Sequence, residues 1–308
     1  MLNRREFVGA VAGTLAGAAA LQAQDAPPNW GNPVIDIHHH WRRPVELNLA
    51  HMNGAGITRS LLLTEASQDA EAAAMPKDRF ARFTSVNVAQ AARLDANMDA
   101  LRKAIATGSL GFGEMKSQVE VDGPEMRRVF ALAAELGVPV LIHFQEVNQT
   151  TSVGTFNRGL SRFPALLKEF PKTIFIGHAD NFWANTSTDV PNDTAYPSGP
   201  IKRSGLTDRM LSDYENLWGD LAAYSGRNFL ARDTDFSADF LKRHQNKLMF
   251  GSDCFCSDGK GTGQTNPLPL IAGKCVARET LGALKQLTAP DVFRKVTWDN
   301  AMRLLKLA

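Results

Sequence analysis

The amino-acid sequence predicts an α/β protein with a single domain, a (β/α)8 TIM barrel. Its length of 308 residues is ordinary for one such barrel, and 44% hydrophobic against 21% charged residues is typical of a chain with a large packed core. Eight short apolar runs alternate with segments of helical spacing. The connections that follow the apolar runs are longer and more polar than those that precede them, as in barrels that carry a site at one end.

The predicted strands follow one another along the whole chain. They are Pro33–His38, Ser60–Thr64, Phe83–Val88, Leu110–Met115, Val138–His143, Thr173–His178, Leu217–Leu221 and Lys247–Asp253. Near-continuous apolar runs of this length are typical of parallel strands buried on both faces. Between them apolar residues return every three or four positions, as in Met126, Val129 and Phe130, which indicates helices with one buried face. Alternating strands and helices build βαβ units, although the count alone also allows an open doubly wound sheet.

The loops indicate which end of the barrel carries the site. Leu136-Gly137 is a short connection from a helix to a strand, whereas Phe144–Arg158, Ala179–Asp208 and Cys254–Gly273 are long and polar and follow strands. Active sites of barrels are built from the loops at the carboxyl ends of the strands. We therefore expect the active site at that end, with substrate choice determined by these three loops.

The first 23 residues have the pattern of an export signal. The Arg4-Arg5 pair precedes an apolar, Gly- and Ala-rich stretch from Val8 to Leu21, and small residues lead to a cleavage position after Ala23. The paired arginines resemble the twin-arginine motif, with a Sec signal or an uncleaved anchor as alternatives. Residues 24–32 are then a linker and residues 33–308 the barrel. This predicts a periplasmic or secreted protein with no membrane span in the mature chain.

Charge and cysteine content exclude two classes of protein. Lys and Arg number 34 against 32 Asp and Glu, and no basic stripe stands out, so we expect a small-molecule substrate and no nucleic-acid partner; homo-oligomers are left open. Three cysteines cannot build a disulfide framework. Cys254 and Cys256 are interpreted as buried or loop thiols, with a Cys256–Cys275 bridge left open, and His51 as a structural histidine.

Potential metal ligands recur at the ends of the predicted strands. Because side chains alternate along a strand, His38 and His40 share one face and His39 points away. Three further strands end in such a residue: His143, His178 and Asp253. Several imidazoles and a carboxylate at one rim indicate a site for a divalent metal ion.

The fourth strand ends with two more polar side chains on one face, Glu114 and Lys116. Either belongs to a second metal position or to substrate binding. Lys116 can hold a substrate carboxylate or form an ion pair with Glu114. Asp36 shares the inward face of the first strand with His38 and is interpreted as a support for the ligands or as structural, and not as a ligand itself.

These residues together resemble the amidohydrolase superfamily, specifically its amidohydrolase-2 branch. The motifs are Asp36-Ile37-His38-His39-His40, the strand-end His143 and His178, Gly251-Ser252-Asp253, and a closing helix similar to Asn300–Leu305. The resemblance implies that His38, His40, His143 and Asp253 bind metal and that His178 is a catalytic base or a further ligand. On the fourth strand the superfamily commonly has a carboxylated lysine that bridges two metals. Here Glu114 and Lys116 compete for that position, so one ion and two ions are both open.

The expected function is that of a metal-dependent hydrolase, with zinc as the expected ion, acting on a small amide, ester or lactone. A divalent cation activates water and polarises a carbonyl. Asp253 can take the proton of the water and pass it to the leaving group, while His178 stabilises an oxyanion or protonates the departing atom. The alternative is a non-oxidative decarboxylase, because the resembling branch contains both chemistries. A non-catalytic periplasmic binding protein is a minor alternative.

Overall fold

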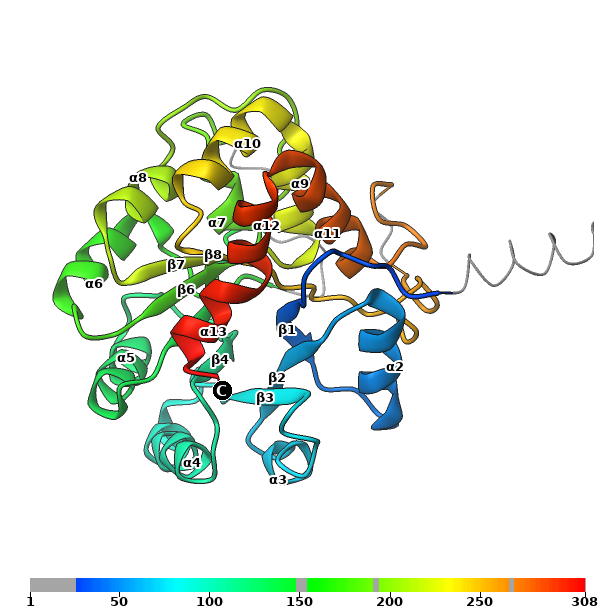
Figure 1. Ribbon diagram of the computed structural model, residues 1–308. Helices are drawn as coiled ribbons and strands as arrows, with labels where there is room; N and C mark the ends of the chain where they lie inside the picture. The colour runs from blue at the N-terminus through cyan, green and yellow to red at the C-terminus, as the bar shows by residue number, and fades with distance from the viewer. Residues whose placement is uncertain (1–25, 148–153, 191–193, 266–268, 308) are drawn as a thin grey trace, which may run out of the picture.

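The wall of the barrel consists of eight parallel strands that pair in chain order, and the predicted single-domain (β/α)8 barrel is confirmed (Figure 1). The computed structural model describes residues 26–147, 154–190, 194–265 and 269–307; the predicted export signal, residues 1–23, lies outside them. The strands are β1 Ile35–His40, β2 Arg59–Glu65, β3 Phe80–Ser85, β4 Phe112–Met115, β5 Val140–His143, β6 Phe175–His178, β7 Leu217–Asp220 and β8 Leu248–Met249. The amide of Ile37 donates to the carbonyl of Phe250 at 3.1 Å, which brings the end of the sheet back to β1.

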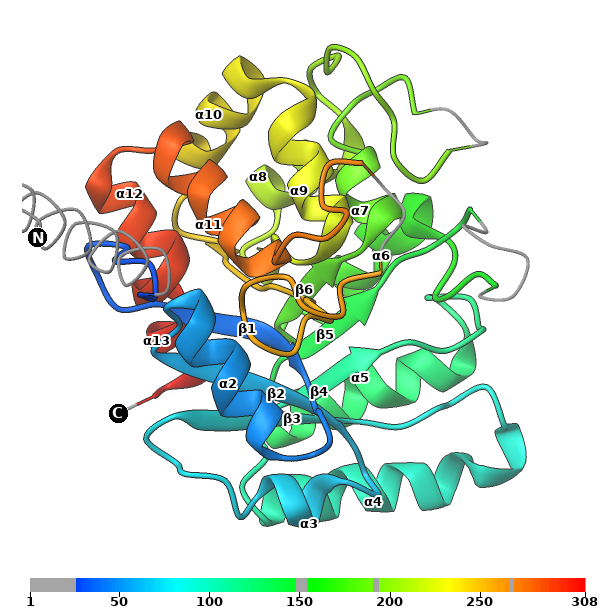
Figure 2. The ribbon, with the colours of Figure 1, turned by 90° about the vertical axis from the view of Figure 1, so that its right-hand side faces the viewer.

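Helices surround this wall, as Figures 1 and 2 show. They are α2 Glu46–Ala55, α3 Asp69–Ala72, α4 Leu94–Ala106, α5 Pro124–Leu136, α6 Phe163–Glu169, α7 Asp180–Ala184, α8 Leu206–Asp213, α9 Ala223–Arg232, α10 Thr234–Arg243, α11 Val276–Leu287, α12 Pro290–Arg294 and α13 Asn300–Leu305, with short turns of other helix types at Ala91–Arg93, Leu160–Arg162 and Lys295–Asp299. Helix α5 begins at Pro124 and ends before Gly137, whose φ of 67° is left-handed, so the two residues that favour these positions bound it. Within the described ranges, no helix has the length and apolar character needed to cross a bilayer.

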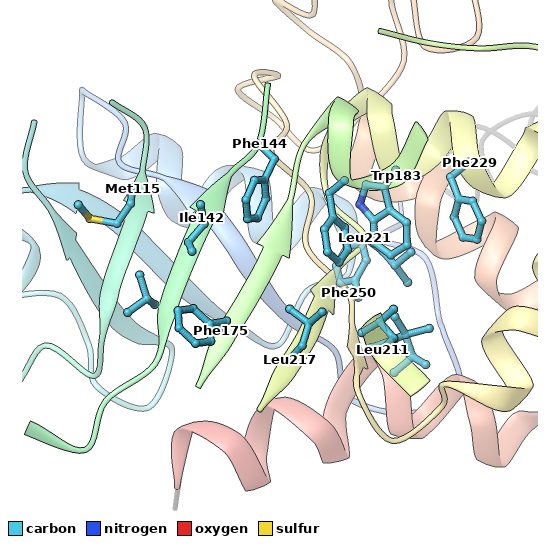
Figure 3. Packing of buried hydrophobic residues seen from close by; sticks show 14 of the residues in the cluster. Met115, Ile142, Phe144, Phe175, Trp183, Leu211, Leu217, Leu221, Phe229 and Phe250 are labelled. Atoms are coloured by element: carbon cyan, nitrogen blue, oxygen red, sulfur yellow. The ribbon is translucent and has the colours of Figure 1, made fainter. Parts of the chain in front are cut away.

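Two buried clusters hold the fold together. The larger one fills the space between strands and helices, where Phe144, Phe175 and Trp183 pack with their neighbours (Figure 3). The smaller one includes Leu141 and Ile176, which lie two residues before His143 and His178 and therefore share their inward face. Ala301 and Leu305 of α13 belong to the same cluster. The inside of the barrel is thus packed with apolar side chains beneath the polar carboxyl ends of the strands.

Several predicted boundaries differ from the structure, and three of the differences are informative. The third strand runs over Phe80–Ser85 rather than Phe83–Val88; it contains Arg82, a charge that is tolerated because its Nε donates to Asp69 at 2.7 Å. The eighth strand has only Leu248 and Met249, because the amide of Phe250 donates to Val296 instead of continuing the ladder. The region 179–208, predicted as a loop, contains α7 and the start of α8.

Candidate metal centre

The carboxyl ends of the strands bring one set of polar side chains together. β1 contributes His38 and His40, and the other members are Glu114 on β4, His143 on β5, His178 on β6, Asp220 on β7 and Asp253 in the loop after β8. Parallel strands that run in one direction place their ends at one rim, so these residues meet although they span more than two hundred positions. The site-residue assignments made from the sequence remain predictions; the structure supplies their geometry.

Glu114 lies in the middle of this set. Its Oε2 is 3.4 Å from Nε2 of His40 and 3.8 Å from Nε2 of His38. Its Oε1 is 3.7 Å from Nε2 of His178 and accepts a hydrogen bond from Nδ1 of His143. The two oxygens of one carboxylate therefore face two different pairs of imidazoles.

Asp253 lies in the loop after β8, across the junction of β8 and β1 from His38 and His40, and its carboxylate faces some of the same imidazoles as Glu114. Its Oδ1 lies 3.2 Å from Nε2 of His40 and 3.9 Å from Nε2 of His38, and its Oδ2 lies 4.0 Å from Nε2 of His178. Three overlapping groups of donor atoms result, each with its atoms within 4.8 Å of one another: His38–His40–Glu114, Glu114–His143–His178 and His38–His178–Asp253.

The chemistry of these donors fits a divalent metal ion. Among the described residues, Nε2 of His178 and Oδ1 of Asp253 are buried and have no hydrogen-bond partner in the protein. Buried polar atoms without a partner are costly, so lone pairs in this position call for a ligand. Imidazole and carboxylate together are the donors that zinc and manganese accept.

The electrostatics point the same way. Burial opposes ionisation of Glu114, yet the charge and hydrogen bond of His143 hold its pKa well below the usual range. Burial likewise opposes a charge on His40, but the neighbouring carboxylates of Asp253 and Glu114 raise its pKa to about 10. The pKa of Asp220 is also lowered, against burial, by the charge of His38. The site holds an excess of carboxylates, which protons or a cation must balance.

Asp220 is a site residue that the sequence analysis missed. Its fully buried carboxylate accepts from Nδ1 of His38 at 2.6 Å, and its Oδ2 is 3.2 Å from Nδ1 of His178. A carboxylate on Nδ1 orients each ring and leaves Nε2 for a ligand. The signal was present in part, because Asp220 is the last residue but one of the predicted seventh strand, Leu217–Leu221, and an acidic residue within an otherwise apolar run.

Replacing Asp220 by asparagine should weaken metal binding by about 10- to 100-fold, because the neutral amide orients His38 and His178 less firmly and makes their Nε2 atoms less basic. Metal titration of the purified protein measures this. The matched control is Asp208→Asn, which removes another carboxylate that contacts a histidine, His244 at 2.7 Å, away from the strand ends. Wild-type metal affinity in Asp220→Asn would show that Asp220 only packs the core.

The remaining predicted residues take other positions. Lys116 is exposed, and its Nζ lies 5.1 Å from the ring centre of Phe156. No ion pair joins it to Glu114, whose carboxylate faces His143 instead, so the predicted alternative of a Lys116–Glu114 ion pair is wrong. Asp36 accepts from the amide and hydroxyl of Ser252 at 2.8 and 2.5 Å and so ties β1 to the segment before Asp253. Cys254, Cys256 and Cys275 are buried free thiols, so the Cys256–Cys275 bridge is not formed.

A cavity of about 640 Å³ opens beside the centre. Two residues of the centre, His40 and Glu114, line it, and its other lining residues include Lys116, Arg93, Asn87 and Asn97. This volume suits a small molecule. The lining thus includes two cationic side chains, Arg93 and Lys116.

The family follows from comparison with known proteins. A sequence model described as amidohydrolase matches residues 63–307. The chain belongs to the amidohydrolase family. This amidohydrolase is therefore an enzyme of a metal-dependent superfamily, as the resemblance predicted, and the match does not depend on His38 or His40, which precede it. No curated protein sequence matches the chain.

Solved structures share the fold of this amidohydrolase at low sequence identity. A 2,6-dihydroxybenzoate decarboxylase from Rhizobium is 14% identical, with a TM-score of 0.54 over 90% of this chain and 99% of that one. A probable 2-pyrone-4,6-dicarboxylic acid hydrolase from Acinetobacter baumannii is 14% identical, with a TM-score of 0.55 over 89% and 100%. A 5-carboxyvanillate decarboxylase from Novosphingobium aromaticivorans, complexed with manganese, is 12% identical, with a TM-score of 0.57 over 92% and 99%.

Proposed function

We propose that this amidohydrolase is an exported hydrolase with two divalent metal ions that acts on a small amide, ester or lactone. The observation that carries the proposal is the position of Glu114, whose two carboxylate oxygens face separate pairs of imidazoles. A carboxylate in that position can bridge two ions, as a carboxylated lysine does elsewhere in the superfamily. His38 and His40 would hold one ion and His143 and His178 the other, with zinc as the proposed metal.

Two ions held in this way would supply an activated water and polarise the substrate carbonyl. The protein groups then have separate tasks. Asp253, with its unpartnered Oδ1 facing the cluster, accepts the proton of the water and delivers it to the leaving group. Asp220 keeps His38 and His178 in the orientation that presents Nε2 to the centre.

The cavity supports a substrate that carries a carboxylate. Arg93 and Lys116 line it together with Glu114, so a negatively charged end can bind the cations while the carbonyl lies near the histidines. The three structural neighbours are named for carboxylate compounds, in agreement with this proposal. The same cations also favour the second candidate, a non-oxidative decarboxylase.

The experiment that separates these candidates uses labelled water. Metal-loaded protein is screened against lactones, amides and aromatic acids, and products of the best substrate are formed in ¹⁸O-water. We expect one labelled oxygen in the new carboxylate, because hydrolysis adds water to a carbonyl. His178→Asn should also lower metal content, since His178 is proposed as a ligand. Stoichiometric CO₂ with a solvent deuteron on the vacated carbon would instead establish the decarboxylase.

Export rests on the first residues of the chain. The Arg4-Arg5 pair and the apolar stretch from Val8 to Leu21 support a twin-arginine signal. That route carries folded proteins, so an exported enzyme would acquire its metal ions before it leaves the cytoplasm. The proposal therefore places the active enzyme in the periplasm or outside the cell.

A further inference from the structure

A second group of potential ligands lies outside the strand-end centre. Cys254 and Cys256 come from the loop after β8, Cys275 directly precedes α11, and His51 lies in α2. All four side chains are buried, with at most 3% of any residue exposed. Figure 2 shows the loop that follows β8 beside α2 and α11, the two helices to which these residues belong.

Two of the three ligand-to-ligand distances within this group match those of a tetrahedral metal site. Sγ of Cys254 is 3.8 Å from Sγ of Cys275, and Sγ of Cys256 is 3.5 Å from Nδ1 of His51. Zinc bonds of about 2.3 Å to sulfur and about 2.0 Å to nitrogen separate tetrahedral ligands by about 3.8 Å for two sulfurs and about 3.5 Å for sulfur and nitrogen. The Cys254 and Cys256 sulfurs, 3.2 Å apart, are closer than this, but far from the roughly 2.05 Å of a disulfide.

Ordinary packing does not account for the group. Thiols are weak hydrogen-bond donors and acceptors, so three of them gain little from facing one another. Nδ1 of His51 lies 3.1 Å from the carbonyl oxygen of Cys256 as well as 3.5 Å from its sulfur, and Nε2 of the same ring is buried without a partner in the described part of the chain. The group is also separate from the strand-end centre, because His39, which contacts the His51 ring, is turned away from that centre toward Ser60.

We propose that His51, Cys254, Cys256 and Cys275 bind one zinc-class divalent ion as a closed Cys3His structural site. Four protein ligands fill a tetrahedral shell, so no position remains for water or substrate, and such an ion stabilises the fold. The thiolates and the neutral imidazole bind it, and the thiol protons pass to solvent. The site is independent of the proposed hydrolase activity.

The ion would fasten the loop that carries Asp253. Its ligands join residues 254–256 to α2 and to the start of α11, where the loop already packs so tightly that a Cβ on Gly54 would overlap the carbonyl of Asp258. Phe255, between two ligands, is 67% exposed, and its ring lies parallel to His40 at 6.5 Å. The site would therefore hold an exposed aromatic side chain next to the mouth of the strand-end centre.

Cobalt(II) tests the proposal, because sulfur-to-cobalt charge transfer gives an intense near-ultraviolet absorption that nitrogen and oxygen ligands do not give. Purified full-length protein loaded with cobalt(II) chloride should show this absorption. Cys275→Ser removes one of the three thiolates. The absorption should therefore fall by about a third if the ion still binds, and disappear if it no longer binds. Asp253→Asn and His143→Asn, which alter only the strand-end centre, should retain it.

Two further measurements keep the result decisive. If Cys275→Ser does not fold, His51→Cys preserves four ligands and should increase the absorption with its fourth thiolate. Absence of thiolate absorption in the cobalt-loaded wild-type protein would overturn the proposal. A native mass two hydrogens lower than that of the reduced chain would overturn it as well, because a disulfide would then occupy the site. Neither outcome depends on turnover, so failure here is distinguishable from failure of the hydrolase proposal.

Discussion

Glu114→Gln should remove one metal ion per chain and lower kcat by about 10³-fold or more. The missing ion would no longer stabilise the transition state, and each loss of about 1.36 kcal/mol of that stabilisation lowers the rate tenfold. Glutamine has one oxygen and one NH₂ where the native residue has two charged oxygens. It can therefore serve the His38–His40 side or the His143–His178 side, and not both. Elemental analysis together with steady-state kinetics on the best substrate measures both effects.

The control for this change is Glu146→Gln. Glu146 accepts from the amides of Gly159 and Leu160 at 2.9 Å in the loop after β5, and it has no contact with the histidines. Its metal content should equal that of the wild-type protein. If Glu114→Gln retains both its metal and its turnover, Glu114 does not bridge two ions, and the two-ion proposal is wrong.

Asp253→Asn should lower kcat/KM by about 10²- to 10⁴-fold, the usual contribution of a positioned general base. The amide oxygen still offers a ligand atom near His40 and His38, so much of the metal should remain, whereas Asp253→Ala should lose most of it. The wild-type pH profile of kcat/KM should rise with an apparent pKa that belongs to the activated water and Asp253 jointly, and the asparagine variant should lack the contribution of the carboxylate.

A second carboxylate in the same loop provides the comparison. Asp258 accepts from the amides of Lys260 and Thr262 at 2.8 and 3.1 Å and takes no part in the cluster of histidines. Asp258→Asn should leave kcat/KM within about threefold of wild type, as expected for a change outside the site. Equal losses in Asp258→Asn and Asp253→Asn would mean that loop structure, and not proton transfer, explains the effect.

The polar residues at the carboxyl ends of the strands could be predicted from the sequence, because they follow from local patterns. An apolar run that ends in His143 or His178 identifies both the strand and its carboxyl end, and parallel strands bring such ends together. Arg82 shows the limit of this reasoning, because a charge inside the third strand shifted the predicted boundary by three residues. Its partner Asp69 lies in another element, which only the fold places beside it.

The contacts that the sequence did not reveal are those between distant segments. Asp220 was assigned to an apolar strand, and its contact with His38 depends on how the sheet curves back toward β1. Cys254 and Cys256 were predicted to be buried or loop thiols, but nothing local indicated that His51, some two hundred positions earlier, lies against Cys256. Single-sequence patterns identify faces and ends of elements; they do not identify partners across the barrel.

The shortness of β8 has a consequence for how this enzyme unfolds and loses bound metal. The closing seam depends on the amides of Ile37 and Asp253, which donate to Phe250 and His38, rather than on a long ladder. His38 and Asp253 lie on opposite sides of that seam, so any ion bound by both spans it. Local unfolding at the seam would separate the two ligands, and a bound ion opposes that opening by mass action. Metal loss and thermal inactivation should then be a single event, with a rate that depends on the concentration of free metal.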